Sequence, residues 1–145
     1  MNDYISVIAR VLNIRLNVII ENNKSDTQYT TKTVAYYKLQ NGYNIYIREK
    51  DDYSIFDMYI IAREIRIMWQ FNKNFEYYFY GYRLKGMTEE EYESHISNID
   101  ADVFAYLIIR NKYKKEIIRN YKYDSSRVKF EKLLNNAIIK GKYLN

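Results

Sequence analysis

The stretch SIFDMYIIAREIRIMWQF, residues 54–71, decides the fold of this chain. Ser54 and Asp57 have the three-residue spacing of a capping box, which favours a helix that starts directly after Ser54. Apolar side chains recur nearly all the way round that helix, as they do in helices that are covered on several sides. We therefore expect a central helix. Its broadest buried face is predicted at Ile60, Ile61, Glu64, Ile65 and Met68.

Two β-rich runs precede this helix and predict a hairpin. TVAYYKLQ, residues 33–40, and YNIYIR, residues 43–48, flank Asn41-Gly42, the preferred dipeptide of a type I′ turn. The earlier run RLNVII, residues 15–20, alternates as a half-buried strand does. The apolar positions of that strand are Leu16, Val18 and Ile20.

Helical patterns also stand at both ends of the chain. Asn2 or Asp3 is the predicted cap of a first helix. Residues 21–31 are polar and predict a loop. A last helix is expected to begin near residues 124–126, and Gly141 suits the C′ position at its end.

The aromatic run FEYYFYGYR, residues 75–83, is expected to be extended or irregular. Thr88 and Glu91 form another capping box, which predicts one long helix over residues 88–113. The resulting order, α-β-β-β-α-α-α, indicates an α+β fold in which a small antiparallel sheet with a hairpin packs on a helical bundle. Its length predicts a single domain, 1–145, with a basic helical extension from about residue 111 to 145.

Composition narrows the possible chemistry. The chain has no cysteine and one histidine, His95, which excludes disulfides, thiol catalysis and a metal site with several histidines in one chain. We expect His95 to be a surface or partly buried polar residue. Neither a signal peptide nor an apolar run long enough to span a bilayer is present, which predicts a soluble protein of the host cytoplasm without a membrane partner.

Charge is distributed unevenly along the chain. The formal net charge is +5, but eleven basic and only three acidic residues follow from Tyr106 onward. A basic C-terminal third can attract nucleic acid or an acidic protein surface, and it can also be a plain solvated helix face. The five basic residues with which it would contact nucleic acid are Lys112, Lys114, Lys115, Arg119 and Lys122.

Two ordered motifs carry the most specific signal. The first is AREIRIMWQ, residues 62–70, on the central helix, and the second is NIDADVFA, residues 98–105, on the following long helix. Together with the preceding hairpin they resemble the small zinc peptidases of the ImmA/IrrE type, which are common regulators in phages and other mobile elements. Those peptidases carry A-H-E-[LI]-x-H-x-[WY]-Q and then E-x-[DE]-A-[DN]-x-F-A. The resemblance covers about residues 2–110 and implies a minimal zincin-like scaffold.

The departures from the family pattern are as informative as the matches. Zinc requires two histidines at i and i+4, but Arg63 and Ile67 stand at those positions, and Asn98 aligns with the third, acidic ligand. Arginine stays protonated and isoleucine has no donor atom. Glu64 aligns with the general base, yet without a metal-bound water it has nothing to activate. The resemblance therefore implies a degenerate fold, no metal or other cofactor, and no enzyme.

Arg63 is expected to point toward the site that the metal would have occupied. Its guanidinium would replace the charge of the zinc ion and pair with Glu64, Asp100 or Asp102. Arg63, Glu64, Ile67, Asn98, Asp100 and Asp102 are thus the predicted degenerate site.

The leading functional hypothesis is a non-catalytic, protein-binding inhibitor or regulator that a phage or mobile element encodes, for example against a host defence nuclease. Tyrosine and arginine are enriched at protein interfaces, so the aromatic run supplies the predicted partner-binding surface. The predicted partner-binding residues are Tyr77, Tyr78, Tyr80, Tyr82 and Arg83.

Two alternatives remain open. The first is nucleic-acid binding by the basic C-terminal region. The second is a residual metal-dependent hydrolase that uses Glu64.

Elemental analysis of the untagged, purified protein tests the ligand alignment directly. We expect no bound transition metal, because none of the three ligand positions carries a histidine or a carboxylate. One zinc or manganese ion per chain would mean that the alignment is wrong, and would favour an enzyme.

Overall fold

The computed structural model describes residues 1–22, 33–38, 42–83 and 85–144, and the statements below concern those ranges. The predicted central helix is present as α2, Ile55–Lys73, and its capping box forms as expected: the Asp57 N–H donates to Ser54 Oγ, and the Ser54 N–H donates to the Asp57 carboxylate. The other elements are α1 (Asn2–Leu12), β1 (Leu16–Glu21), β2 (Ala35–Tyr37), β3 (Tyr43–Arg48), α3 (Phe75–Phe79), α4 (Glu89–Glu93), α5 (Ile96–Tyr113) and α6 (Asp124–Ile139).

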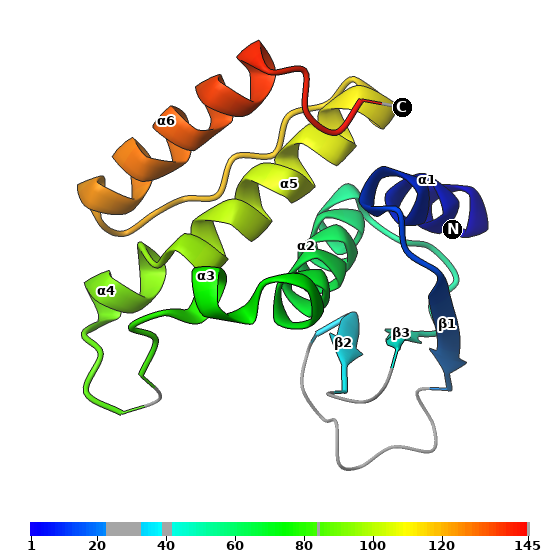
Figure 1. Ribbon diagram of the computed structural model, residues 1–145. Coiled ribbons are helices and arrows are strands. Elements are labelled where there is room, and N and C mark those ends of the chain that lie inside the picture. Colours follow the sequence, from blue (N-terminus) through cyan, green and yellow to red (C-terminus); the bar gives the residue numbers. More distant parts are fainter. Residues whose placement is uncertain (23–32, 39–41, 84, 145) are drawn as a thin grey trace.

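Helix α2 lies in the middle of the molecule (Figure 1). The small sheet packs on one side of it and α5 on another, while α6 covers the far side of α5. Of the predicted buried face, Ile61, Ile65 and Met68 are buried, whereas Ile60 and Glu64 are only partly covered. The prediction of a central helix is therefore confirmed, and the fold belongs to the expected α+β class.

Helix α5 is even more deeply enclosed than α2. Every residue from Ser97 to Ile109 is buried, because α2 covers one side of α5 and α6 another. Phe104 and Ile108 join the main core with α1, α2 and the sheet, whereas Val103 and Leu107 pack with Phe130 of α6 in a second, smaller core. This part of α5 has no solvent-exposed side, so a charged residue on it needs a partner inside the protein.

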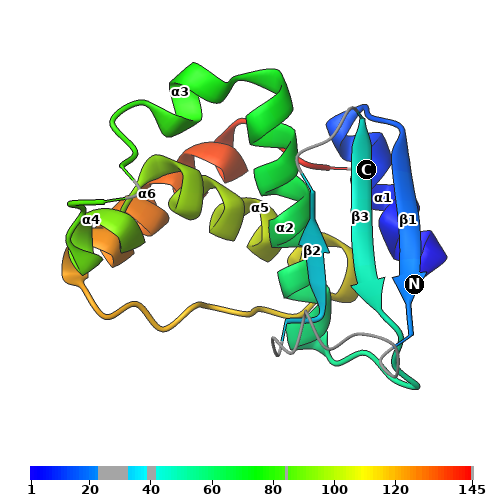
Figure 2. The same cartoon turned by 90° about the horizontal axis from the view of Figure 1, so that it is seen from below.

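The sheet corrects one prediction. Its strand order is β1-β3-β2; β2 and β3 are antiparallel, but β1 and β3 are parallel, so the sheet is mixed rather than antiparallel (Figure 2). Ile45 and Ile47 of β3 are completely buried. This strand occupies the centre of the sheet, and β1 pairs with it instead of with β2. Ile20, at an edge strand, is exposed and not half-buried as predicted.

The hairpin itself is confirmed, but its register differs from the expected one. A two-residue turn at Asn41-Gly42 would place Tyr37 opposite Tyr46. Tyr37 is instead opposite Ile45, and Tyr36 is opposite Tyr46, with the two tyrosine rings stacked at 5.0 Å between centroids. Asn41 lies outside the described residues, as does nearly all of the loop predicted at residues 21–31.

The aromatic run corrects a second prediction, because it begins with the short helix α3. Phe75 and Phe79 are four residues apart on one face of α3, and the break in the helix at Asn74 turns this face back onto Phe71 of α2. The centroids of Phe71 and Phe79 are 4.1 Å apart, and Phe75 lies within 5.5 Å of both. Mutual packing of these rings explains why the run turns helical directly after Asn74.

The long helix predicted over residues 88–113 is broken in two. The capping box of Thr88 and Glu91 forms, but α4 ends at Glu93. His95 then begins α5 as its N-cap, where its Nδ1 accepts the Ser97 N–H. The histidine is partly buried, as expected, and its capping role explains the break.

Two predictions concerned the ends of helices near the chain termini, the cap of α1 and the C′ glycine of α6, and only the second is confirmed. The predicted side-chain cap of α1 is absent: Met1 is the N-cap and no side chain caps it. Gly141 has φ +62° at the C′ position after α6, with the Lys142 N–H donating to the Ala137 carbonyl, as a Schellman motif requires. Within the described ranges, none of the helices combines the length and apolarity that crossing a bilayer needs.

Residues 114–123, here called the strap, connect α5 to α6 without regular secondary structure. The strap runs back alongside α5 toward α4 (Figure 1). This course brings its side chains next to residues of α2, α4 and α5 that are distant in the sequence.

Candidate functional site

Two buried arginine–aspartate pairs cross the interface between α2 and α5. Arg63 Nε lies 2.7 Å from Asp102 Oδ1, and Arg66 Nε lies 2.7 Å from Asp100 Oδ2. The arginines are three residues apart on α2, and the aspartates belong to the enclosed part of α5. Because α5 has no solvent-exposed side there, its two carboxylates need cationic partners on the neighbouring helix.

Asp102 is completely buried and receives hydrogen bonds from four side chains. Its Oδ1 accepts from Arg63 Nε at 2.7 Å and from the Tyr59 hydroxyl at 2.8 Å. Its Oδ2 accepts from the Tyr121 hydroxyl at 2.8 Å and from Arg119 Nη1 at 3.2 Å. Burial, and then the charge of Asp102, raise the pKa of Tyr59 and of Tyr121 far above the usual range. Both phenols therefore stay protonated as donors.

Asp100 belongs to a second cluster. Arg66 binds it through both Nε and Nη2, and Gln70 Nε2 donates to its Oδ2 at 2.7 Å. The guanidinium of Arg66 also lies 4.0 Å from the centre of the Trp69 ring and donates to the hydroxyl of Tyr78. Burial, and then the charge of Asp100, raise the pKa of Tyr78 to about 12.

The predicted degenerate site is thus divided between neighbouring clusters. Arg63 meets Asp102, donates to Asn98 Oδ1 at 2.8 Å and has Glu64 at 3.9 Å. The expected contact of Arg63 with Asp100 is not made, because Arg66 occupies that carboxylate. Ile67 is half-buried one turn further along α2.

Sequence reasoning missed several members of these clusters. Arg66 stands between Ile65 and Ile67, in a stretch predicted to be buried, and a charged residue at such a position signals a buried partner. Tyr59, which binds Asp102, and Gln70, which binds Asp100, lie on α2 with Arg66. Tyr121 has no local signal, because only the path of the strap brings it to Asp102.

The donor set does not favour a cation. Within the described ranges, no group of three or more histidine, cysteine or acidic side chains is arranged to hold a metal ion. A metal at Asp102 would have to displace the guanidinium groups of Arg63 and Arg119. The cluster is instead an arrangement of ion pairs and hydrogen bonds that joins α2, α5 and the strap.

Glu64 is half-buried next to this cluster. Burial raises the pKa of its carboxyl group, and the charge of Arg63 counteracts that effect only in part. Burial and then the charge of Glu64 raise the pKa of Tyr37 on β2. The charge of Glu64 is therefore felt at Tyr37 on β2 as well as at Arg63.

The predicted partner-binding residues do not all lie at the surface. Tyr77, Tyr80 and Arg83 are exposed, and Tyr82 is partly exposed. Tyr78 is buried against Trp69 and Arg66, so we remove it from that surface. We call the exposed residues Phe75, Tyr77, Tyr80 and Arg83, together with the partly exposed Tyr82, the α3 surface.

The basic residues predicted to bind nucleic acid are separated from one another. Lys112 lies 2.6 Å from Asp3 of α1, and Lys122 lies 2.8 Å from Glu89 of α4. Arg119 pairs with Asp102, while Lys114 donates to the Asn111 carbonyl. An extended strap of ten residues spans up to about 33 Å, so it distributes these cations over distant parts of the molecule. Lys115 is exposed.

A comparison of this chain with protein families, curated proteins and solved structures finds no match. The resemblance to zinc peptidases therefore rests on the residues named above.

Replacing Asp102 tests whether the cluster holds the helices together. Asp102→Asn should lower the free energy of unfolding by about 3–5 kcal/mol, because it removes the completely buried carboxylate and leaves the partly buried guanidinium of Arg63 without its counter-charge. Urea denaturation measures this loss.

Asp3→Asn is the matched control, since Asp3 also forms an ion pair but is exposed. Its removal should hardly change stability. Equal losses in the two variants would contradict a special role for Asp102.

Glu64→Gln tests the effect of burial on Glu64. Because the pKa of this carboxyl group is raised, the folded protein keeps its proton to higher pH than the unfolded chain, and stability falls as pH rises through that pKa. The variant should therefore be more stable than the natural protein at pH 7 and nearly equal to it at pH 4. Denaturation across this range measures the difference, with Glu76→Gln at an exposed position as control. A difference independent of pH would contradict the prediction.

Proposed function

We propose that this chain is a non-catalytic protein with a zinc-peptidase-like scaffold, and that it acts by binding another protein. The observation that most supports the scaffold is the contact between Arg63 and Asn98 at 2.8 Å. These residues are 35 positions apart in the sequence, yet the resemblance assigns both to ligands of a single metal ion. Their contact across α2 and α5 is what a common origin of the two sites would produce.

The chemistry of the site favours binding over catalysis. A hydrolase that used Glu64 would need a polarised water beside it. Glu64 instead has a guanidinium group 3.9 Å away, and the carboxylate of Asp102 is already bonded to four donors. None of these groups is placed to polarise or activate a substrate.

The α3 surface is the proposed contact region. Phe75, Tyr77 and Tyr80 expose large rings next to Arg83, and such residues contribute most of the binding energy at protein interfaces. The stacked rings of Phe71, Phe75 and Phe79 support the surface from below. Because this support limits motion before binding, less conformational entropy is lost in a complex.

The resemblance also suggests the biological setting. Peptidases of this type are regulators in phages and mobile elements. We therefore propose that the chain is encoded by such an element and inhibits or regulates a host protein, for example a defence nuclease.

Nucleic-acid binding is the second candidate, and one observation favours it. Arg110, Lys114 and Lys142 line a hollow of about 540 Å³ beside the end of α5, with Glu116 as its one acidic lining residue. Phosphate binding there would weaken steeply with added salt, because it releases counterions. Protein binding through the α3 surface would depend far less on the salt concentration.

Photocrosslinking distinguishes these candidates. A benzoylphenylalanine at position 80 replaces Tyr80, which is 86% exposed, and the control position is Ile139 on α6, which is 84% exposed. In cells that encode the chain, we expect a protein adduct from position 80 and none from position 139. The absence of a protein adduct at position 80, or nucleic-acid adducts in its place, would contradict the proposal.

A further inference from the structure

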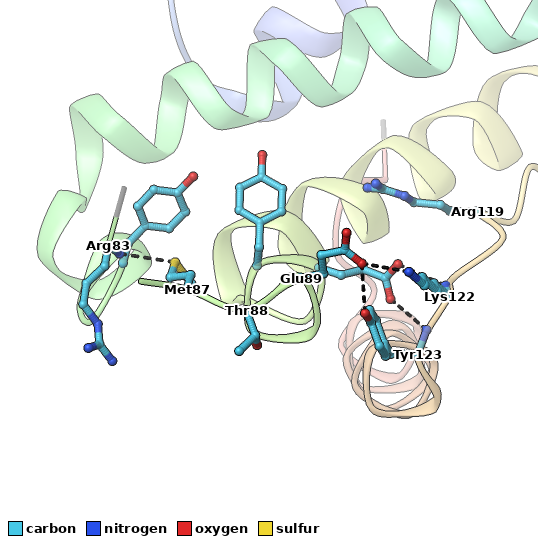
Figure 3. A pocket seen from close by; sticks show the side chains of 10 residues that line it. Arg83, Met87, Thr88, Glu89, Arg119, Lys122 and Tyr123 are labelled. Carbon is cyan, nitrogen blue, oxygen red and sulfur yellow. Dashed lines mark hydrogen bonds and ion pairs between the residues drawn. The ribbon is translucent and has the colours of Figure 1, made fainter. Parts of the chain in front are cut away.

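Two hollows beside the strap share two lining residues, Tyr92 and Arg119. The first, of about 530 Å³, lies between α4, the segment before it and the strap, and Figure 3 shows Arg83 and Arg119 at its two ends. The second, of about 400 Å³, lies between α2 and the strap. Because Tyr92 and Arg119 line both hollows, we treat them as one continuous site, the strap groove.

One end of the strap groove is apolar. Phe56 of α2 is 59% exposed, Ile118 of the strap 66% and Tyr92 of α4 51%, and all three line the same hollow. Three elements that are far apart in the sequence thus bring exposed apolar side chains to a single place. Such convergence on a soluble domain marks a binding site more often than chance exposure does.

The junction of the two hollows offers a cation, Arg119. Only Nη1 of Arg119 donates to Asp102, and within the described ranges its Nε and Nη2 have no hydrogen-bond partner. Glu93 accepts the N–H groups of Lys122 and Tyr123, and Glu89 pairs with the Lys122 ammonium group. The acidic side chains of the groove are therefore already bonded, whereas Arg119 can still bind an anion.

The buried cluster also orients Arg119. Asp102 holds one nitrogen of the guanidinium at 3.2 Å, and Tyr121 fixes the strap two residues further on. An arginine that is oriented before binding loses less entropy when it forms a bidentate contact. The Arg63–Asp102 cluster thus provides structural support for a recognition site.

We propose that the strap groove binds a peptide segment of the partner protein that carries a carboxylate beside a large apolar side chain. The carboxylate binds Arg119, and the apolar side chain packs among Phe56, Ile118 and Tyr92. This inference rests on the proposed protein-binding function and specifies the chemistry of its partner. A nucleic acid fits the groove less well, because a single carboxylate can be placed at Arg119 alone, whereas the successive phosphates of a nucleic acid would also lie against Glu89 and Glu93.

An array of twelve-residue peptides tests the groove on the purified protein. Half of the peptides carry glutamate at varied distances from a leucine or phenylalanine, and the other half carry lysine in place of the glutamate. We expect the acidic peptides to bind about tenfold or more tightly than their lysine counterparts, which corresponds to one charged contact. Arg119→Gln should abolish this preference, with circular dichroism as the check that the variant is folded.

Ile118→Asp should weaken binding of the acidic peptides by about tenfold or more, because it places a charge at the apolar end. Ile139→Asp is the matched control, since that isoleucine is exposed on α6 outside the groove, and it should bind like the natural chain.

Three results would overturn the inference. The first is that no peptide of the array binds. The second is that Ile118→Asp binds the acidic peptides as tightly as the natural chain does. The third is that a single-stranded oligonucleotide binds in the groove more tightly than the acidic peptides. If the photocrosslink from position 80 still captures a protein, the proposed function stands and only the groove assignment is wrong. If that crosslink fails as well, the proposed function is wrong too.

Discussion

The buried carboxylate of Asp102 is the interaction on which the rest of the structure depends. It accepts hydrogen bonds from Tyr59 and Arg63 on α2 and from Arg119 and Tyr121 on the strap. One side chain of α5 therefore sets the positions of two other parts of the chain. A carboxylate offers about four acceptor positions, so this set of partners satisfies it, and the loss of one donor would leave a buried acceptor position without its hydrogen bond.

Charged pairs give the α2–α5 interface a register that apolar packing would not define as sharply. Apolar side chains on both helices can pack in several similar arrangements. The pairs Arg63–Asp102 and Arg66–Asp100 are satisfied in only one of them, since a shift of one turn would leave buried charges unpaired. We therefore interpret the two pairs as determinants of the unique fold, at some cost in desolvation.

The same cluster connects the scaffold to its proposed function. In a zinc peptidase the metal would join the two helices and activate water. Here guanidinium groups join the helices, and Arg119 extends from the cluster toward the surface. A site of this kind supports recognition, because its cation is oriented by buried partners and its apolar neighbours are exposed.

Several features followed from the sequence by itself, because their causes are local. The capping boxes at Ser54 and Thr88, the hairpin before α2 and Gly141 at the end of α6 each depend on residues within a few positions of one another. The α+β class and the position of Arg63 beside Asp102 were also predicted.

Tertiary structure alone decided the remaining features. Among them are the central position of β3 and its parallel pairing with β1, whose residues lie 27 positions away in the sequence. The partnership of Arg66 with Asp100 and the approach of Tyr121 to Asp102 arise from contacts between distant segments. No local pattern encodes such contacts, because their energy comes from burial and charge pairing that exist only once the chain has folded.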